Sequence, residues 1–263
     1  MHDSMDIAKQ AARTSGEILR NNIRGVRTVT YKGDINLVTE MDMMSERAIV
    51  KVLRSVFPDH SIVAEEETDI RTASPFTWII DPLDGTTNYA HGYPCFSVSL
   101  AQAREGDVIL GVVYDPMRDE LFSASKSGGA YLNGEKIAVS KTDDLIRSLL
   151  ATGFPYDRTV SEKNNLDYFQ NLLMASQEVR RDGSAALDLC YVAMGRFDGF
   201  WELKLKPWDV AAGSLILAEA GGVVTDLSGY AFDMHAEEIL ATNGLIHKAM
   251  LEIIYRTKDH ERR

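Results

Sequence analysis

Two aspartates, Asp81 and Asp84, stand three residues apart at the end of an apolar run and are the side chains best placed for chemistry. They belong to the segment 78–86, which reads WIIDPLDGT. One interpretation is an apolar strand that stops at an Asp-Pro turn, as strands often do. A turn needs only one such aspartate, however, whereas paired carboxylates suit a hard divalent cation that prefers oxygen ligands. The segment therefore predicts a metal site.

The residues around this pair predict an anion site beside the metal. Pro82 fixes one φ angle and removes one amide donor, which helps the chain bend so that both carboxylates reach one place. Gly85 and Thr86 follow where the chain is expected to re-enter a helix, and free amides at a helix start bind anions. A cation beside an anion site is what hydrolysis of a phosphate ester requires.

Two other classes of aspartate motif do not fit. A calcium-binding EF-hand loop that began at Asp81 would need glutamate at its twelfth position, which is Gly92. Phosphatases of the haloacid dehalogenase family use two aspartates that are two residues apart, whereas the spacing here is three. On an extended segment this difference changes which face each carboxylate occupies, so a phospho-aspartate intermediate is not expected.

Apolar periodicity predicts the elements that must hold these residues. We expect helices over 4–22, 162–175, 207–220 and 245–256, another that ends before Pro58, and strands over 61–64, 76–80, 96–103, 108–114 and 149–152. The strand over 61–64 runs into Glu65, so its end could converge with the end of the strand over 76–80. Glu105 and Gly106 lie between two of these strands and predict a hairpin, and the pair Asn133-Gly134 favours a type I′ turn. Hairpins before residues 140–147 and alternating strands and helices after them predict layered α and β elements around mixed sheets.

Composition limits the class of protein. The 263 residues have 45% hydrophobic and 25% charged content, as ordinary globular proteins do. A formal net charge of −11 disfavours a nucleic acid or an anionic membrane as the main partner. Cys95 and Cys190 fit no disulfide framework or metal motif and are expected to be buried thiols. Because we find no signal-peptide core and no apolar stretch of ~18 residues, a cytoplasmic location is the expectation.

Four motifs in register make the chain similar to one known family. They are Ala64-Glu65-Glu66, residues 78–88 (WIIDPLDGTTN), Gly183-Ser184-Ala185 and residues 207–213 (PWDVAAG). With these motifs the sequence resembles the inositol monophosphatase family over nearly its whole length. The resemblance implies an α+β fold, a layered αβαβα sandwich with an antiparallel sheet in the N-terminal half and a mixed sheet in the C-terminal half. It also implies one domain over 1–263, with a metal and phosphate part at about 1–143 and a polyol-binding part at 144–263.

The resemblance further implies the ligands of two to three Mg²⁺ ions. Glu65, Asp81 and the backbone carbonyl of Leu83 match the ligands of the first ion. Asp81, Asp84 and Asp209 match those of the second, and Glu65 with waters would hold a weaker third ion. Asp209 has a second interpretation, because a carboxylate in the first turn of a helix stabilises that helix without any metal.

The remaining catalytic and phosphate-binding residues follow from the same resemblance. The amides of Gly85 and Thr86 would bind phosphate, and Thr86 with Asp42 would orient and help activate the attacking water. Glu65 joins these two as a catalytic residue through its metal ion. Asp42 also reads as an ordinary carboxylate at a helix N-terminus.

The alcohol half of the substrate would contact Glu202 and the turn Gly183-Ser184-Ala185, together with Asp84 and Asp209. Glu202 could equally be an exposed strand residue, and Ser184 only a helix cap. The residues 206–209 (KPWD) are similar to those of bacterial members, which leaves strict inositol specificity open.

The resemblance implies Mg²⁺-dependent hydrolysis of a small polyol phosphate, first of all myo-inositol 1-phosphate, by in-line attack of metal-activated water. It also implies inhibition by lithium and a homodimer. A broader sugar phosphatase acting on fructose 1,6-bisphosphate, or a nucleotide 3′-phosphatase, is the alternative within enzymes. A non-catalytic binding partner of the transcription machinery is the alternative from another class.

Overall fold

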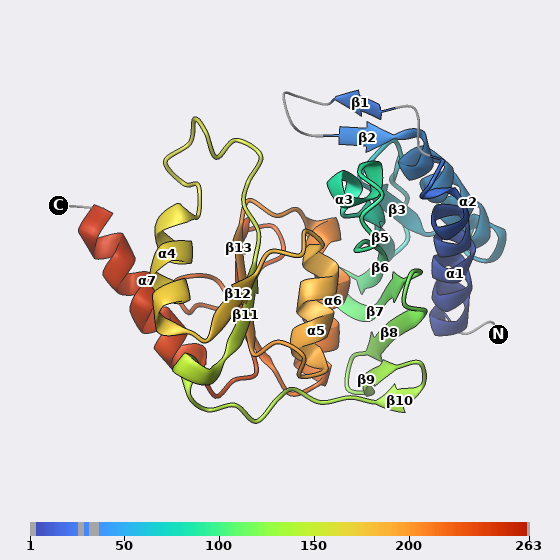
Figure 1. The fold of residues 1–263 in the computed structure, drawn as a ribbon. Helices are drawn as coiled ribbons and strands as arrows, with labels where there is room; N and C mark the ends of the chain where they lie inside the picture. Colours follow the sequence, from blue (N-terminus) through green and yellow to red (C-terminus); the bar gives the residue numbers. More distant parts are fainter. Residues whose placement is uncertain (1–3, 26–28, 32–36, 262–263) are drawn as a thin grey trace.

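The computed structural model describes residues 4–25, 29–31 and 37–261, and its helices and sheets alternate in five layers (Figure 1). Helices α1 (Ser4–Asn22) and α2 (Glu40–Val56) cover the outer face of the first sheet. Helices α5 (Ala185–Ala193) and α6 (Pro207–Glu219) lie between this sheet and the second one. Helices α4 (Leu166–Ala175) and α7 (His247–Glu261) cover the far face of the second sheet. The predicted αβαβα sandwich is confirmed.

The first sheet contains eight strands in the order β10-β9-β8-β7-β6-β5-β3-β4. They are β3 (Ser61–Ala64), β4 (Asp69–Ile70), β5 (Phe76–Asp84), β6 (Ser97–Arg104), β7 (Asp107–Asp115), β8 (Glu120–Ser125), β9 (Gly129–Leu132) and β10 (Glu135–Lys136). Neighbouring strands are antiparallel except β3 and β5, which run parallel with Ala64 opposite Ile80. Because Ala64 lies opposite Ile80, Glu65, which follows β3, and Asp81, which lies within β5, come to the same place.

The second sheet has five strands in the order β12-β11-β13-β15-β14. They are β11 (Leu149–Thr152), β12 (Glu178–Arg180), β13 (Gly199–Leu203), β14 (Val223–Thr225) and β15 (Glu238–Thr242). Strand β11 is parallel to both its neighbours and the other pairs are antiparallel, so this sheet is mixed, as predicted. The short strands β1 (Val29–Tyr31) and β2 (Leu37–Thr39), helix α3 (Thr86–Ala90) and the 3-10 turn Leu145–Arg147 complete the described elements.

The tight turns of the first sheet form where the sequence predicts them. Glu105 and Gly106 have φ angles of 53° and 90°, and Asn133 and Gly134 have φ angles of 50° and 88°. Two successive positive φ angles are the signature of the type I′ turn that joins twisted antiparallel strands. The first turn joins β6 to β7, and the second joins β9 to β10.

Three elements differ most from the prediction. Helix α7 was expected over 245–256 but spans His247–Glu261. Strand β5 does not stop at Ile80 but continues to Asp84, so the aspartates lie within the strand. Helix α4 begins at Leu166, four residues later than expected. The reason is the tertiary role of Asn165, whose side chain amide donates to the carbonyl of Gly153 at 2.6 Å and accepts from the indole of Trp201 at 2.7 Å. The division of the chain near residue 143 stays a prediction.

The described helices include none with the length and apolar character that a membrane crossing requires. In the described part of the chain, Cys95 and Cys190 are buried free thiols, as predicted.

Helix α6 packs directly on the first sheet at Gly111 of β7. A Cβ atom at Gly111 would lie 2.7 Å from the carbonyl oxygen of Ala212 and 3.1 Å from its Cα. On the other side of α6, a Cβ atom at Gly213 would lie 2.7 Å from the Cβ of Leu189 in α5. Small residues therefore let α6 approach both the sheet and α5, which fixes the position of its N-terminus beside β5.

Replacing Gly111 by alanine should destabilise the protein by about 1–3 kcal/mol, because the new methyl group meets backbone atoms that cannot rotate away. Thermal unfolding measures this change. Gly128→Ala is the matched control, because its Cβ would meet chiefly the hydroxyl of Ser125, a side chain that can turn. Equal melting temperatures for the two variants would contradict the close packing of α6.

Candidate functional site

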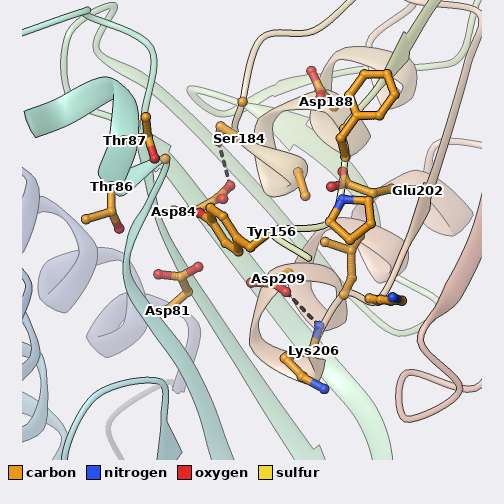
Figure 2. Close-up of a pocket in the computed structure, with 18 of the residues that line it drawn as sticks. Asp81, Asp84, Thr86, Thr87, Tyr156, Ser184, Asp188, Glu202, Lys206 and Asp209 are labelled. Atoms are coloured by element: carbon orange, nitrogen blue, oxygen red, sulfur yellow. Dashed lines mark hydrogen bonds between the residues drawn. The ribbon is translucent and has the colours of Figure 1, made fainter. Parts of the chain in front are cut away.

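A cavity of about 550 Å³ opens where the edge of the first sheet meets the N-termini of α5 and α6. Its wall contains all the predicted site residues except Asp42: Glu65, Asp81, Leu83, Asp84, Gly85, Thr86, Gly183, Ser184, Ala185, Glu202 and Asp209. Figure 2 shows Asp81, Asp84 and Asp209 near the centre of this space, with Thr86 and Thr87 on one side and Glu202 and Asp188 on the other. The fold thus brings together residues that are up to 144 positions apart.

Asp81 lies at a β-bulge. Asp81 pairs with Ser99 of β6 and Asp84 pairs with Ser97. From one pair to the next, β5 advances by three residues but β6 by only two, so β5 contains one extra residue, which defines the bulge. The bulge lets one Asp81 carboxylate oxygen accept the amide of Leu83 at 2.9 Å. Burial, and then the charges of Glu65, Asp84 and Asp209, raise the pKa of Asp81 well above its usual range.

Asp84 is held by the beginning of α5. Its Oδ2 accepts the hydroxyl of Ser184 at 2.5 Å, the amide of Ala186 at 2.9 Å and the hydroxyl of Ser97 at 3.4 Å. Ser184 occupies the N-cap position, but its hydroxyl makes no capping bond within the helix, so the aspartate from β5 satisfies the helix start instead. Burial raises the pKa of Asp84 to about 6, although the bonds from Ser184 and Ala186 lower it.

Asp209 lies in the first turn of α6, and its Oδ2 accepts the amide of Lys206 at 2.6 Å. Pro207 occupies the first helical position, where its missing amide costs no hydrogen bond. Burial in the cavity wall, together with the charge of Asp84, raises the pKa of Asp209 to about 8. Asp209 therefore stabilises the helix start, as one interpretation predicts, and also faces the cavity, while its role as a metal ligand stays a prediction.

Thr86 and Asp42 meet as the sequence predicted. The hydroxyl of Thr86 lies 3.1 Å from Oδ1 of Asp42, in the first turn of α2, and 3.1 Å from the carbonyl of Leu83. Asp42 is buried behind the cavity wall rather than in it.

Gly85 has a φ of 100°, and a Cβ there would lie 3.1 Å from the carbonyls of Cys95 and Gly183, so the position favours glycine.

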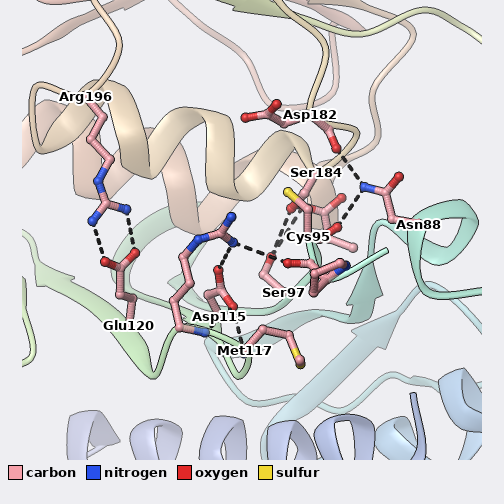
Figure 3. A network of polar contacts seen from close by, with 12 residues as sticks. Asn88, Cys95, Ser97, Asp115, Met117, Glu120, Asp182, Ser184 and Arg196 are labelled. Carbon is pink, nitrogen blue, oxygen red and sulfur yellow. Dashed lines mark hydrogen bonds and ion pairs between the residues drawn. The ribbon is translucent and has the colours of Figure 1, made fainter. Parts of the chain in front are cut away.

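Asn88 fastens the turn at Gly183 to the end of β5 (Figure 3). Its side chain amide donates to the carbonyl of Asp182 at 2.6 Å and to that of Cys95 at 2.7 Å. Just beyond the C-terminal end of α5, Arg196 forms an ion pair with both oxygens of Glu120 in β8. These contacts hold the two ends of α5 against the first sheet, so Ser184 keeps its place beside Asp84.

The far side of the cavity carries two carboxylates, only one of which the sequence predicted. Glu202 faces the cavity, and a Cβ at Gly153 would overlap its carboxylate, so glycine makes the room for it. Burial raises the pKa of Glu202 to about 8, although Arg181 lowers it. Asp188, four residues after Ser184 on α5, is also buried there, and its Oδ1 has no hydrogen-bond partner among the described residues. The helical spacing from Ser184 was the signal that could have identified Asp188.

The carboxylates of this cavity could serve as ligands of a hard cation, although their oxygen atoms do not yet converge on a single position. Nowhere in the described ranges do three His, Cys, Asp or Glu side chains already form a metal centre. The donors are nevertheless all oxygen atoms, and the hydrogen bonds of Asp81, Asp84 and Asp209 engage one oxygen of each. The second oxygen of each remains for a ligand, so this chemistry fits Mg²⁺.

Without divalent cations, the protein should become less stable as the pH rises from about 5 to 8. The folded state holds the pKa of Asp84 near 6 and those of Asp209 and Glu202 near 8, all above their values in the unfolded chain. The folded protein therefore retains protons that the unfolded chain has released, and stability falls with pH in this window.

Thermal unfolding in a chelator at pH 5.5 and pH 8 measures this slope. Asp209→Asn should reduce the slope, whereas Asp107→Asn, which alters an exposed pair with Lys126, should leave it unchanged. Added Mg²⁺ should stabilise the wild type more at pH 8 than at pH 5.5. A melting temperature that rises with pH in the chelator would contradict these pKa shifts.

Comparison with known proteins gives the family. Residues 1–260 match the model of the inositol monophosphatase family. The chain is 44% identical to an inositol-1-monophosphatase of Synechocystis over 96% of this chain and 89% of that protein, and 42% identical to the Nus factor SuhB of Escherichia coli over 95% of both. An inositol monophosphatase structure from Anabaena superposes with a TM-score of 0.88 at 43% identity, covering 96% of this chain and 95% of that one. The chain therefore belongs to the inositol monophosphatase family and is a phosphoric monoester hydrolase.

Proposed function

We propose that this protein hydrolyses small polyol phosphate monoesters, with myo-inositol 1-phosphate as the first candidate, and that it requires Mg²⁺. The main observation that supports the proposal is that the predicted metal, phosphate and substrate residues line one cavity. Carboxylates from β5, from the turn after β3 and from α6 line it together with the amides that follow β5. The relatives named inositol monophosphatases support the choice of substrate.

In this proposal, Glu65, Asp81, Asp84, Asp209 and the carbonyl of Leu83 would hold two to three Mg²⁺ ions. When bound, magnesium lowers the pKa of water and neutralises charge on the attacking and leaving oxygens. The carboxylates would bind in their ionised form, so metal affinity should increase with pH across the raised pKa values of Asp84 and Asp209.

The phosphate would lie against the amides of Gly85 and Thr86. Helix α3 is only five residues long, so these first amides, rather than a long helix dipole, would supply the attraction. The Thr86 hydroxyl donates its hydrogen to Asp42, so the lone pairs of the Thr86 oxygen remain to accept a hydrogen bond from the attacking water. Thr86 and Asp42 would in this way orient the attacking water toward phosphorus.

The alcohol half of the substrate would lie between Asp84, Asp209, the turn Gly183-Ser184-Ala185 and Glu202. Hydroxyl groups are recognised by carboxylate acceptors and backbone groups, and this side of the cavity provides both. Fructose 1,6-bisphosphate or a nucleotide 3′-phosphate stays the alternative substrate. The name Nus factor SuhB belongs to several relatives and supports a binding role as a second candidate function.

A phosphate-release assay with myo-inositol 1-phosphate, fructose 1,6-bisphosphate and adenosine 3′,5′-bisphosphate tests the substrate. We expect the inositol ester to have the highest kcat/KM, activity to vanish in a chelator, and lithium to inhibit. Highest turnover of one of the other two esters would replace the proposed substrate. No turnover of any ester with Mg²⁺ present would favour the binding role.

Asp84→Asn should reduce kcat/KM by about 100-fold or more. Loss of a residue that only hydrogen-bonds to a metal ligand already reduces metal affinity or activity by about 10–100-fold, and Asp84 is proposed as a ligand itself. Asparagine can still accept from Ser184 and Ala186, so the fold and the melting temperature in a chelator should persist. Asp107→Asn serves as the surface control. Wild-type turnover by Asp84→Asn would remove Asp84 from the proposed metal ligands.

A further inference from the structure

A buried carboxylate outside the cavity, that of Glu46 in α2, binds the turn that carries Glu65. Glu46 is only 2% exposed. Its Oε2 accepts the amide of Glu66 at 3.1 Å, and its Oε1 accepts the amide of Glu67 at 3.1 Å and the hydroxyl of Thr68 at 2.6 Å. Three donors in consecutive residues thus converge on one carboxylate.

Backbone bonds fix the start of the turn. The amide of Ala64 donates to the carbonyl of Thr68 at 2.8 Å, which closes the turn, and the amide of Glu65 donates to the carbonyl of Ile80 at 3.1 Å, which joins it to β5. These bonds fix the start of the turn, and Glu46 fixes the part after Glu65. The pair between Arg47 and Glu67 is exposed, and such surface pairs contribute about 0–1 kcal/mol.

Glu46 belongs to a face of α2 that bonds to three segments of the site. Asp42, one turn earlier, accepts from Thr86, and the hydroxyl of Ser45 donates to the carbonyl of Pro82 at 2.6 Å. The same face therefore contacts the turn with Glu65, the bulge between the two aspartates and the threonine beside the phosphate site. An ordinary packing helix would present apolar side chains here.

We propose that Glu46 is a positioning residue for the metal site, which holds the backbone after Glu65 so that the Glu65 carboxylate faces Asp81. This inference rests on the proposed role of Glu65 as a metal ligand. Outer partners of this kind change metal affinity by about 10–100-fold when they are lost. Glu46 itself contacts no substrate and no metal ion in this proposal.

Glu46→Gln tests the proposal, because glutamine has the same shape but places an amide against donors of the turn. Calorimetric titration of the substrate-free protein with Mg²⁺ should show about 10–100-fold weaker binding. In assays, the Mg²⁺ concentration for half-maximal rate should rise by the same factor, while kcat at saturating Mg²⁺ stays close to the wild type. A purely structural role would lower the melting temperature without this shift.

Glu219→Gln is the matched control. Glu219 of α6 also accepts two backbone amides of a turn, those of Ser127 at 2.7 Å and Gly129 at 2.8 Å, but this turn lies outside the cavity wall. The control should bind Mg²⁺ as the wild type does. If Glu46→Gln does not fold, Thr68→Val removes a single donor and should weaken Mg²⁺ binding, and Thr68→Ser should restore it.

The outcomes separate the two proposals. Wild-type protein that fails to bind Mg²⁺ would overturn the proposed metal site itself. Wild-type protein that binds Mg²⁺ while Glu46→Gln, or Thr68→Val in its place, binds equally well would overturn the role of Glu46 alone. Equal weakening in Glu46→Gln and Glu219→Gln would also overturn it, because the effect would then be general destabilisation.

Discussion

Repulsion among carboxylates in one cavity is the constraint on which the rest of the site depends. Burial raises the pKa of Asp81, Asp84 and Asp209, and the charges of other site carboxylates raise the pKa of Asp81 and Asp209 further. Such a cluster would move apart unless its members were held. Each is held through backbone amides at a bulge or a helix start, which are donors that cannot turn away. A bound divalent cation would neutralise part of this negative charge. The repulsion among the carboxylates therefore favours binding of a cation.

Two helices hold this cluster from opposite sides. Helix α2 bonds to the site through Asp42, Ser45 and Glu46, and α5 bonds to Asp84 through Ser184 and Ala186. Both helices are fixed by packing, α2 against α1 and β5, and α5 against α6 in the apolar layer between the sheets. The geometry of the site is therefore set by core packing, and a change at a position such as Gly111 can reach the site through α6.

The first sheet and the elements that follow it in the chain contribute different chemistry to one cavity. The end of β5 supplies carboxylates and free amides, whereas α5 supplies Asp188, β13 supplies Glu202 and α6 supplies Asp209. Because α5 and α6 follow the first sheet in the chain and pack on it, the cavity forms only when these helices have joined the sheet. Variation on the far side of the cavity can change the alcohol that is recognised without disturbing the residues proposed for metal and phosphate.

The sequence by itself determined the features that depend on neighbours in the chain. The hairpins at Gly106 and Gly134, the helix that begins at Pro207 and the pair Asp81 and Asp84 were all predictable, because turn chemistry and short spacing are local properties. Only the tertiary structure decided the rest. The bond from Ser184 to Asp84 spans 100 residues, that from Asn88 to Asp182 spans 94, and the continuation of β5 depends on pairing with β6. Nothing in the sequence distinguishes Glu46 from other polar helix residues, and only the fold places three donors around it. Hydrogen bonds between distant segments leave no periodic signal, since the partners meet only when packing brings their elements together.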